Sequence, residues 1–298
     1  MIIRSTAKIN LYLQITGKDN SDGYHTIDSL FQEISLSDEI EILPHNQDEI
    51  VFMNMAVDSY TSVHKALSLF KDKFKLQKYY KIRVYKNIPM GAGLGGGSSN
   101  AAFTLMGLAD LNDIQYDEVK GIGKSIGSDV SFFFTGGLCR VTGKGEIVEP
   151  LTQRLTGVYF LIVYPDIHIS TKWAYSLITR YDKCSNMNLH LNNSTINIDL
   201  LRKIVYNNFQ SFVLKKNSSL RKIKQDLDGV LVSQLSFMSG SGSSLVYVYE
   251  DRLLAEKDKE KIGQHGFNKA FVCDPLYRLG SPEKSGRVLS EFNISSGG

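Results

Sequence analysis

The chain has 298 residues, of which 42% are hydrophobic and 22% are charged, a composition close to the globular average that excludes a wholly disordered protein. Its 34 basic and 31 acidic residues leave a net charge of +3, an excess too small to indicate a nucleic-acid-binding surface, although it would not repel an anionic substrate. The three cysteines form no CxxC pair and no apolar run resembles a signal peptide or a membrane span, so we expect a cytoplasmic protein without a zinc ribbon or a disulfide framework.

Apolar and polar residues alternate in several short runs of the N-terminal half, a pattern typical of strands. The predicted strands cover residues 8–16, 27–34, 39–43 and 82–85. The first is predicted to be half-buried and to form a hairpin-like pair with the second through a turn at residues 19–23. Ser37-Asp38 is expected to break the chain before the third strand. Apolar residues at helical spacing predict helices over residues 62–74, 98–111 and 116–126.

Around residues 143–153 the apolar pattern gives way to polar residues and Pro150, which predicts a domain boundary between residues 1–150 and 151–298. In the second half, strands are predicted at residues 158–164, 245–249 and 269–273, and helices at residues 199–205, 219–227 and 252–262. Residues 183–197 are rich in Asn and Ser, which is typical of a loop. Strands and helices follow one another in both halves without an internal repeat, which favours an α+β fold.

The densest glycine region of the chain, residues 91–97, holds five glycines within seven residues. Without side chains, the backbone N–H groups of such a loop can converge on one point. Ser98 and Ser99 follow and can cap the next predicted helix, whose N-terminus adds the positive end of a helix dipole. The sequence therefore predicts a phosphate-binding loop, with a structural turn as the alternative.

Other phosphate and catalytic motifs fit the chain less well. The Walker pattern lacks its Gly-Lys-Ser/Thr, and the Rossmann spacing at Gly91, Gly93 and Gly96 lacks the acidic residue that should follow it. The protein-kinase motifs HRD and DFG do not occur downstream. Residues 123–127 match the G-x-S-x-G elbow of hydrolases, but a helix is predicted before them, where that elbow requires a strand.

Four smaller features carry side chains that are suited to chemistry. Lys8 and Asn10 lie two apart on a predicted strand and project to the same side. Asp129, between a helix end and an apolar run, is a candidate general base or simply a turn residue. Tyr24 and His25 follow a turn, where they can stack on and hydrogen-bond a planar ring. Residues 238–243 form a second glycine turn that could approach phosphate.

Taken in order, these features resemble the GHMP kinase family. That family combines an N-terminal strand bearing a lysine, a central Pro-x-Gly-x-Gly-Leu-Gly-Ser/Gly-Ser-Ser loop and a C-terminal glycine loop. All three are present here, and the central loop at residues 89–102 is the most specific match. Residues 7–11 and 22–25 resemble those of the members that act on a cytidine-diphosphate-linked polyol. Residues 127–130 match the Gly-Ala-Asp-Val turn of those members, with Ser128 in place of alanine.

The resemblance implies a two-domain α+β kinase with its active site in the interdomain cleft. There ATP, with Mg²⁺, would phosphorylate the 2-hydroxyl of the methylerythritol part of the substrate, with Asp129 as general base and Lys8 as its charge partner. The implied ATP-binding residues are Pro89, Met90, Gly91, Ala92, Gly93, Leu94, Gly95, Gly96, Gly97, Ser98 and Ser99. The implied substrate-binding residues are Asn10, Tyr24, His25, Thr171 and Tyr175, and the C-terminal loop near the phosphates comprises Ser239, Gly240, Ser241 and Gly242. No acidic cage predicts a metal ligand.

The family often has an asparagine where this chain has Tyr60-Thr61-Ser62, so the sequence leaves adenine recognition open, and it carries no family signature beyond Asp251. Two other functions also stay open. A GHMP kinase for another small alcohol would bind an acceptor that has no planar base. A non-catalytic nucleotide-binding protein would be expected to lose Lys8 or Asp129. The expected partner is a small-molecule substrate, with no nucleic acid and no membrane, and the oligomeric state is not predicted.

Overall fold

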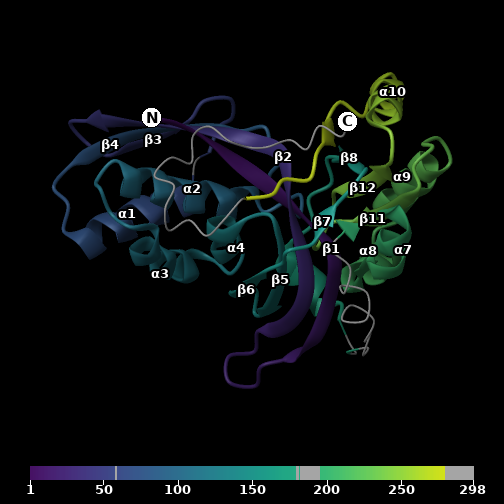
Figure 1. The fold of residues 1–298 in the computed structure, drawn as a ribbon, viewed down its shortest axis with the longest axis horizontal. Coiled ribbons are helices and arrows are strands. Elements are labelled where there is room, and N and C mark those ends of the chain that lie inside the picture. Colours follow the sequence, from purple (N-terminus) through teal and green to yellow (C-terminus); the bar gives the residue numbers. More distant parts are fainter. Residues whose placement is uncertain (58, 179–180, 182–194, 279–298) are drawn as a thin grey trace.

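The computed structural model describes residues 1–57, 59–178, 181 and 195–278. Figure 1 shows two groups of helices on the outside and two sheets between them. The large sheet consists of β1 (Ile2–Lys18), β2 (His25–His45), β3 (Glu49–Phe52), β4 (Tyr79–Tyr85), β5 (Leu138–Gly143), β6 (Ile147–Pro150) and β10 (Tyr206–Asn207). The helices that cover it are α1 (Ser62–Phe74), α2 (Gly96–Asp110), α3 (Tyr116–Ile126) and α4 (Val130–Thr135).

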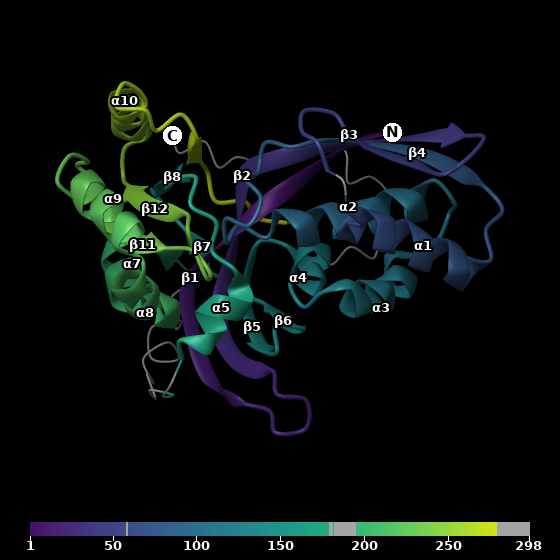
Figure 2. The ribbon, with the colours of Figure 1, turned by 180° about the vertical axis from the view of Figure 1, so that it is seen from behind.

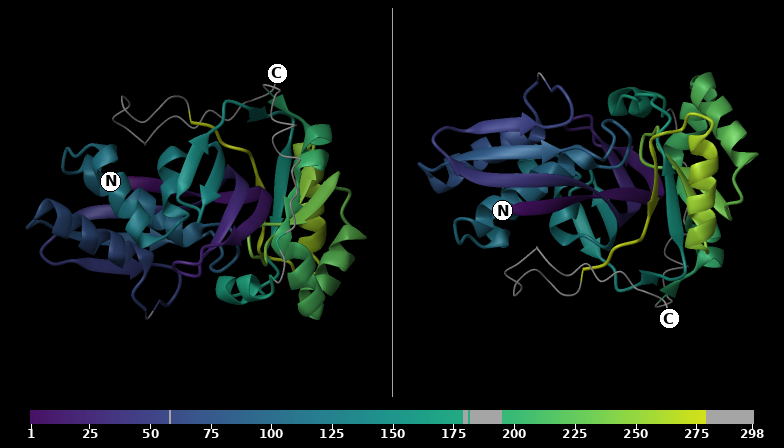
Figure 3. Two further views of the ribbon diagram at one scale, coloured as in Figure 1. Left: turned by 90° about the horizontal axis from the view of Figure 1, so that it is seen from below. Right: turned by 90° about the horizontal axis from the view of Figure 1, so that it is seen from above.

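The smaller sheet has the order β11-β12-β8-β13 and is antiparallel throughout. Its strands are β8 (Tyr159–Val163), β11 (Leu235–Met238), β12 (Leu245–Tyr249) and β13 (Ala270–Cys273). The helices of this half are α5 (Thr171–Ser176), α7 (Ile198–Ile204), α8 (Asn208–Lys216), α9 (Ser218–Asp228) and α10 (Arg252–Gly263), and a short parallel pair joins β7 (Arg154–Leu155) to β9 (Thr195–Ile196). Figures 2 and 3 show α9 and α10 on the outer side of this sheet, away from β1 and β2.

Strand β1 is buried on both faces, so the prediction of a half-buried strand is wrong. Ile9 and Leu11 pack into the core between the two sheets, whereas Leu13 and Ile15 belong to the core under the helices. The change of side occurs at a bulge between Asn10 and Tyr12, where the pairing with β2 shifts by one residue. A strand covered by a helical layer on one face and a second sheet on the other cannot show a polar face to water.

The prediction that Ser37-Asp38 breaks the chain is also wrong, because β2 runs through it as a single strand. A bulge places Thr6 opposite Ser37 and the next residue, Ala7, opposite Ile34. Before the bulge β2 pairs with β5, and after it with β4, so the bulge marks the point where one strand changes partners. The Asp38 carboxylate lies buried beneath β4 instead of capping a turn.

The helices at residues 62–74 and 116–126 have the predicted bounds, but the helix after the glycine loop begins earlier than predicted. It starts at Gly96, with Gly95 as its N-cap in a left-handed conformation. Ser98 and Ser99 therefore lie in its first turn and do not cap it. The Ser99 hydroxyl donates instead to the carbonyl of Thr6, 2.6 Å away, and so holds α2 against β1.

In the second half, the predicted strands and the three predicted helices are confirmed within a few residues. The sequence missed α5, α8, β10 and β11, which are short and present few buried residues. Of the predicted loop at residues 183–197, residues 183–194 lie outside the described part, and Thr195–Ile196 forms β9. The domain division at residue 150 stays a prediction. Strand β10 comes from beyond it, yet pairs in parallel with β1.

No helix in the described part of the chain has the length and hydrophobicity that crossing a membrane requires. Cys139 and Cys273 are buried free thiols, and Cys184 lies outside the described residues.

After β13 the chain returns to the large sheet as a C-terminal strap, residues 274–278. The backbone N–H of Leu276 donates to the carbonyl of Glu33, and the amide of Gln32 donates to the carbonyl of Leu276. The Glu33 carboxylate is fully buried and accepts hydrogen bonds from Thr6, from the N–H of Gly137 and from the Arg278 guanidinium at 2.6 Å. A single buried carboxylate thus joins β1, β2, the end of α4 and the strap.

We predict that Arg278→Ala lowers the free energy of unfolding by about 3 kcal/mol, because it leaves the Glu33 carboxylate buried without its cation. Urea unfolding followed by circular dichroism measures the change. Arg278→Lys is the matched control, since it keeps the charge and loses only the second hydrogen bond, and should cost clearly less. A loss below about 1 kcal/mol for the alanine variant would mean that the pair behaves like a surface ion pair.

Candidate active site

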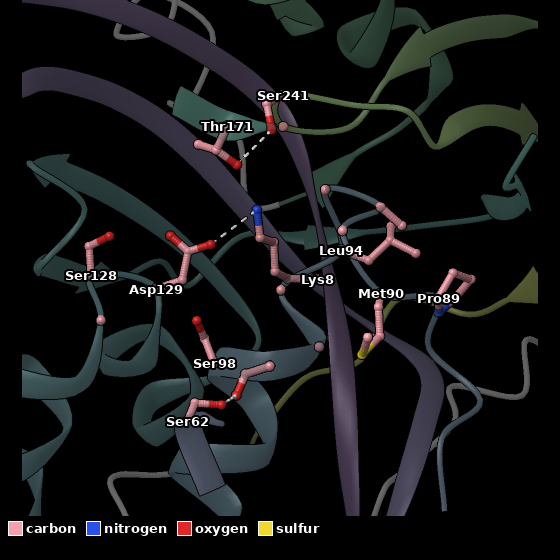
Figure 4. Close-up of a pocket in the computed structure, with 18 of the residues that line it drawn as sticks. Lys8, Ser62, Pro89, Met90, Leu94, Ser98, Ser128, Asp129, Thr171 and Ser241 are labelled. Atoms are coloured by element: carbon pink, nitrogen blue, oxygen red, sulfur yellow. Dashed lines mark hydrogen bonds and ion pairs between the residues drawn. The ribbon is translucent and has the colours of Figure 1, made fainter. Parts of the chain in front are cut away.

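A cavity of about 650 Å³ lies where the two halves of the chain meet. Its lining includes Lys8 and Asn10 from β1, the glycine loop, Asp129 at the start of α4, and Thr171, Tyr175, Gly240 and Ser241 from the second half. Figure 4 shows Lys8 and Asp129 pointing toward one another, with Thr171 and Ser241 close by. Sequence segments that are far apart therefore contribute to one site.

Lys8 and Asp129 form the charged centre of this cavity. The Lys8 ammonium lies 3.4 Å from the Asp129 carboxylate and donates to the Asn10 side-chain oxygen at 2.7 Å. It also lies 4.5 Å from the centroid of the Phe31 ring, a distance suited to a cation–π contact. Lys8 is only 4% exposed, so these contacts replace the water that its ammonium loses. Asp129 occupies the N-cap position of α4 but makes no side-chain cap hydrogen bond, which leaves its carboxylate facing the cavity.

The glycine loop follows the wall of the cavity and leads into α2. The loop is fixed to β1 by the hydrogen bond from the backbone N–H of Lys8 to the carbonyl of Leu94, 3.0 Å long. Gly93 and Gly95 have φ values of +78° and +72°, which disfavour any side chain. A Cβ at Gly93 would overlap the backbone carbonyl of Ser239, and one at Gly95 would lie 3.0 Å from both Lys8 and Phe133. The predicted loop residues Pro89 to Ser98 line the cavity, whereas buried Ser99 does not.

The C-terminal glycine turn closes the cavity against the first loop. The Ser239 hydroxyl donates to the carbonyl of Gly93 at 3.1 Å and accepts from the backbone N–H of Asn10 at 3.3 Å. The hydroxyls of Thr171 and Ser241 are 3.2 Å apart. Of the four predicted turn residues, Gly240 and Ser241 line the cavity, while Ser239 fastens the turn to the first loop.

The predicted aromatic residues are only partly assembled around the cavity. Tyr175 lines it, is stacked on the His25 ring with centroids 4.9 Å apart, and packs edge-on against Phe209. Burial, with the nearby Asp129 carboxylate, raises the pKa of Tyr175 to about 12. Burial also lowers the pKa of His25, so both rings are neutral at pH 7. Tyr24 is 66% exposed at the end of the β1–β2 turn and does not line the cavity.

The sequence reasoning missed several lining residues, among them Lys86, Lys144, His168 and Phe209. Lys86 stands three residues before Pro89, and a cation so close to a glycine loop was a usable signal. Lys144 lies in a Gly-Lys-Gly turn between β5 and β6 and pairs with Asp19 and Asp22, 2.8 and 2.5 Å away. His168 and Phe209 come from the second half, and nothing in their local sequence predicts that they reach this cavity.

Within the described residues, no group of three or more His, Cys, Asp or Glu side chains could hold a metal ion. Asp129 is the single carboxylate in the described lining of the cavity. Mg²⁺ usually keeps several waters and binds through one or two carboxylates together with substrate phosphates. The Asp129 carboxylate and the Ser98 hydroxyl both line the cavity and are protein oxygens that an Mg²⁺ arriving with a nucleotide could use.

Comparison with known proteins identifies the family of this chain. The model of the GHMP kinases N-terminal domain matches residues 61–137. A 4-diphosphocytidyl-2-C-methyl-D-erythritol kinase from Thermosipho melanesiensis is 40% identical over 82% of this chain and 89% of the relative. One from Thermodesulfovibrio yellowstonii is 35% identical over 94% of this chain and 99% of the relative.

Solved structures agree on the fold. The crystal structure of a 4-(cytidine 5'-diphospho)-2C-methyl-D-erythritol kinase superimposes with a TM-score of 0.78, at 24% identity, over 92% of this chain and 98% of that one. A mevalonate kinase structure gives a TM-score of 0.62 at 16% identity, over 92% of this chain and 98% of that one. The chain therefore belongs to the GHMP kinase family and, within it, to the 4-diphosphocytidyl-2-C-methyl-D-erythritol kinases.

Proposed function

We propose that the protein transfers the γ-phosphoryl group of ATP to the 2-hydroxyl of 4-diphosphocytidyl-2-C-methyl-D-erythritol, a step of the non-mevalonate isoprenoid pathway. The observation that carries the proposal is the pairing of Lys8 with Asp129, 3.4 Å apart, in a cavity that also contains the glycine loop. Phosphoryl transfer requires mainly positioning and charge neutralisation. A cation, a carboxylate and a phosphate-binding loop in one cavity meet those requirements.

The glycine loop and the N-terminus of α2 bind the ATP phosphates in this proposal. Backbone N–H groups of residues 91–97 and the positive end of the helix dipole supply the electrostatic attraction. Lys8 adds a full positive charge near the group that is transferred, because its ammonium lies 3.4 Å from the Asp129 carboxylate and 2.7 Å from the Asn10 side-chain oxygen. Mg²⁺ bound with ATP would be held by the phosphates together with the Ser98 hydroxyl, and it would neutralise phosphate charge.

Asp129 acts as the general base in the proposal. Its carboxylate is not used to cap α4, is 31% exposed and faces the cavity, so an acceptor hydroxyl can approach it. It takes the proton of the 2-hydroxyl as the oxygen attacks phosphorus, a role worth about 10²- to 10⁴-fold in rate. The Asn10 side-chain oxygen accepts a hydrogen bond from the Lys8 ammonium and so helps to orient the pair.

The cytidine end of the acceptor is assigned to the aromatic cluster around Tyr175. The ring of Tyr175 lines the cavity, and the neutral His25 ring offers one donor and one acceptor to the edge of cytosine. Thr171 contacts the polyol side, and the exposed ring of Tyr24 is free to cover a base face. A coupled ADP-release assay with the cytidyl acceptor, mevalonate and homoserine tests the assignment. Turnover of mevalonate or homoserine in preference to the cytidyl acceptor would contradict it.

We predict that Asp129→Asn and Lys8→Ala each lower kcat by about 10²-fold or more, with a much smaller effect on the KM of either substrate, because both residues act on the transition state. Steady-state kinetics with the cytidyl acceptor measure both parameters. Ser128→Ala is the matched control, since it alters the residue beside Asp129 without removing a charge, and it should retain most of the turnover. Near wild-type kcat in Asp129→Asn would show that this carboxylate is not the base.

We predict that Gly93→Ala weakens ATP binding at least about tenfold. An alanine is strained at the positive φ of residue 93, and its Cβ would overlap the carbonyl of Ser239. Calorimetric titration with a non-hydrolysable ATP analogue measures the dissociation constant. Gly97→Ala is the matched control within the same loop, because its Cβ would meet nothing closer than the Ser62 hydroxyl at 3.6 Å. Equal affinities for the two variants would mean that the conformation at Gly93 does not matter for the nucleotide.

We predict that Tyr24→Ala raises the KM for the cytidyl acceptor about tenfold and leaves the KM for a truncated acceptor without the base almost unchanged, as expected for one base–aromatic stack. Because this ring is exposed, its removal should change the free energy of unfolding little, so a change in KM can be assigned to substrate binding. Steady-state kinetics with both acceptors measure the effect. Equal losses on the two acceptors would assign Tyr24 to the fold and not to the base.

A further inference from the structure

Asp38 is a buried carboxylate to which neither the sequence motifs nor the proposed reaction gives a role. It lies in β2, is 1% exposed, and does not line the cavity. Its Oδ1 accepts hydrogen bonds from the backbone N–H groups of Asn87 and Ile88, at 2.7 and 2.8 Å. Its Oδ2 accepts from the side-chain amide of Asn100 at 2.9 Å and from the ammonium of Lys86.

These four donors come from the two ends of the glycine loop. Asn87 and Ile88 immediately precede Pro89, where the loop begins. Asn100 lies in α2, directly after the serines with which the loop ends. The residues on both sides of the segment 89–99 therefore donate hydrogen bonds to a single carboxylate. Oδ1 holds the two backbone N–H groups at the entry to the loop, and Oδ2 joins Lys86, which precedes the entry, to Asn100 at the exit.

Lys86 completes the anchor and connects it to the cavity. Its ammonium donates to Asp38 and, at 3.0 Å, to the side-chain oxygen of Asn100, so three side chains bond one another. The Lys86 side chain is 7% exposed and lines the cavity beside Gly96, where a Cβ would lie 3.2 Å from the ammonium nitrogen. Asn100 also donates to the Ser5 hydroxyl in β1 at 2.9 Å, which extends the network to the strand that carries Lys8.

A loop with this many glycines has many accessible conformations, and phosphate binding must select one of them. Fixing both ends before the nucleotide arrives reduces the ordering that binding requires. Hydrogen bonds to an ionised acceptor are about twice as strong as neutral ones, so a buried aspartate is well suited to hold four donors. The cation that compensates Asp38 is Lys86, so the anchor adds no net negative charge next to the phosphates.

We propose that Asp38 is a positioning residue for ATP: it holds the entry and the exit of the phosphate-binding loop and thereby preorganises the loop's N–H groups. The inference rests on the proposed function in one respect, namely that residues 91–97 bind the phosphates of ATP. It predicts an effect on the nucleotide and not on the acceptor, because the hydrogen bonds that the Asp38 carboxylate accepts come from the residues at the entry to the loop, from α2 and from Lys86.

The test is Asp38→Asn, which keeps the size of the side chain but removes the charge and turns one acceptor into a donor facing Lys86 and Asn100. The dissociation constant for a non-hydrolysable ATP analogue and the KM for ATP should each rise at least about tenfold, with the KM for the acceptor within about twofold of wild type. Asp38→Glu, which restores the charge, should recover part of the affinity.

Asp258→Asn is the matched control. Asp258 is 6% exposed and accepts from the backbone N–H of Val232 at 2.8 Å and from the Tyr249 hydroxyl at 2.7 Å, and it does not line the cavity. It should lower the unfolding temperature in the same way as Asp38→Asn but leave the affinity for ATP unchanged. Equal loss of ATP affinity in both variants would reduce the role of Asp38 to general stability and overturn the inference.

Wild-type protein measured in the same titration separates the two proposals. If wild type does not bind the ATP analogue, the proposed function fails. If wild type binds it and folded Asp38→Asn binds it equally well, only the inference about Asp38 fails. Should Asp38→Asn not fold, Asn100→Ala decides, because it removes the exit contact to Asp38, together with the bonds to Lys86 and Ser5, and leaves both backbone contacts to Oδ1 in place. This variant should weaken ATP binding about three- to tenfold, and unchanged affinity would overturn the inference.

Discussion

The burial of strand β1 on both faces is the constraint on which the rest of the site depends. One face of β1 packs against the second sheet through Ile9 and Leu11, so Lys8 and Asn10 must point into the other side. An ammonium with 4% exposure requires partners that replace water, and the chain supplies Asn10, the Phe31 ring and Asp129. Packing thus determines where Lys8 lies, and the electrostatics of Lys8 in turn favour a carboxylate at the start of α4.

The charges around the cavity suit anionic ligands, and each lysine of the described lining also has a carboxylate partner within the protein. Three lysines, Lys8, Lys86 and Lys144, line it in the described residues, and each is paired with a carboxylate. The partners of Lys86 and Lys144, which are Asp38, Asp19 and Asp22, do not line the cavity. A nucleotide or a diphosphate therefore meets N–H groups and ammonium groups that are already oriented, which is the preorganisation that phosphoryl transfer uses.

The sequence predicted features that depend on local chemistry and missed those that depend on distant packing. The glycine loop was singled out from its own composition and the helix after it, whereas the roles predicted for Lys8, Asn10 and Asp129 came from the resemblance to the GHMP kinase family; the structure places all of them at one cavity. The continuous β2 was missed because Asp38, considered with its sequence neighbours alone, resembles a turn residue. Its actual partners, Lys86 and Asn100, are distant in the sequence. His168 and Phe209 were missed for the same reason, since only the contact between the two halves gives them a function in the cavity.

The phosphate-binding loop is consequently not a self-contained motif. Gly93 must be glycine partly because the Ser239 carbonyl of the second half occupies the space of a side chain, and the Ser239 hydroxyl holds the Gly93 carbonyl. The other side of the loop is held by Asp38 and Lys86 of the first half. Its conformation is thus fixed from both halves at once. The C-terminal strap secures the relative position of the halves through Glu33 and Arg278. The conformation of the phosphate-binding loop therefore depends on the contacts that hold the halves together.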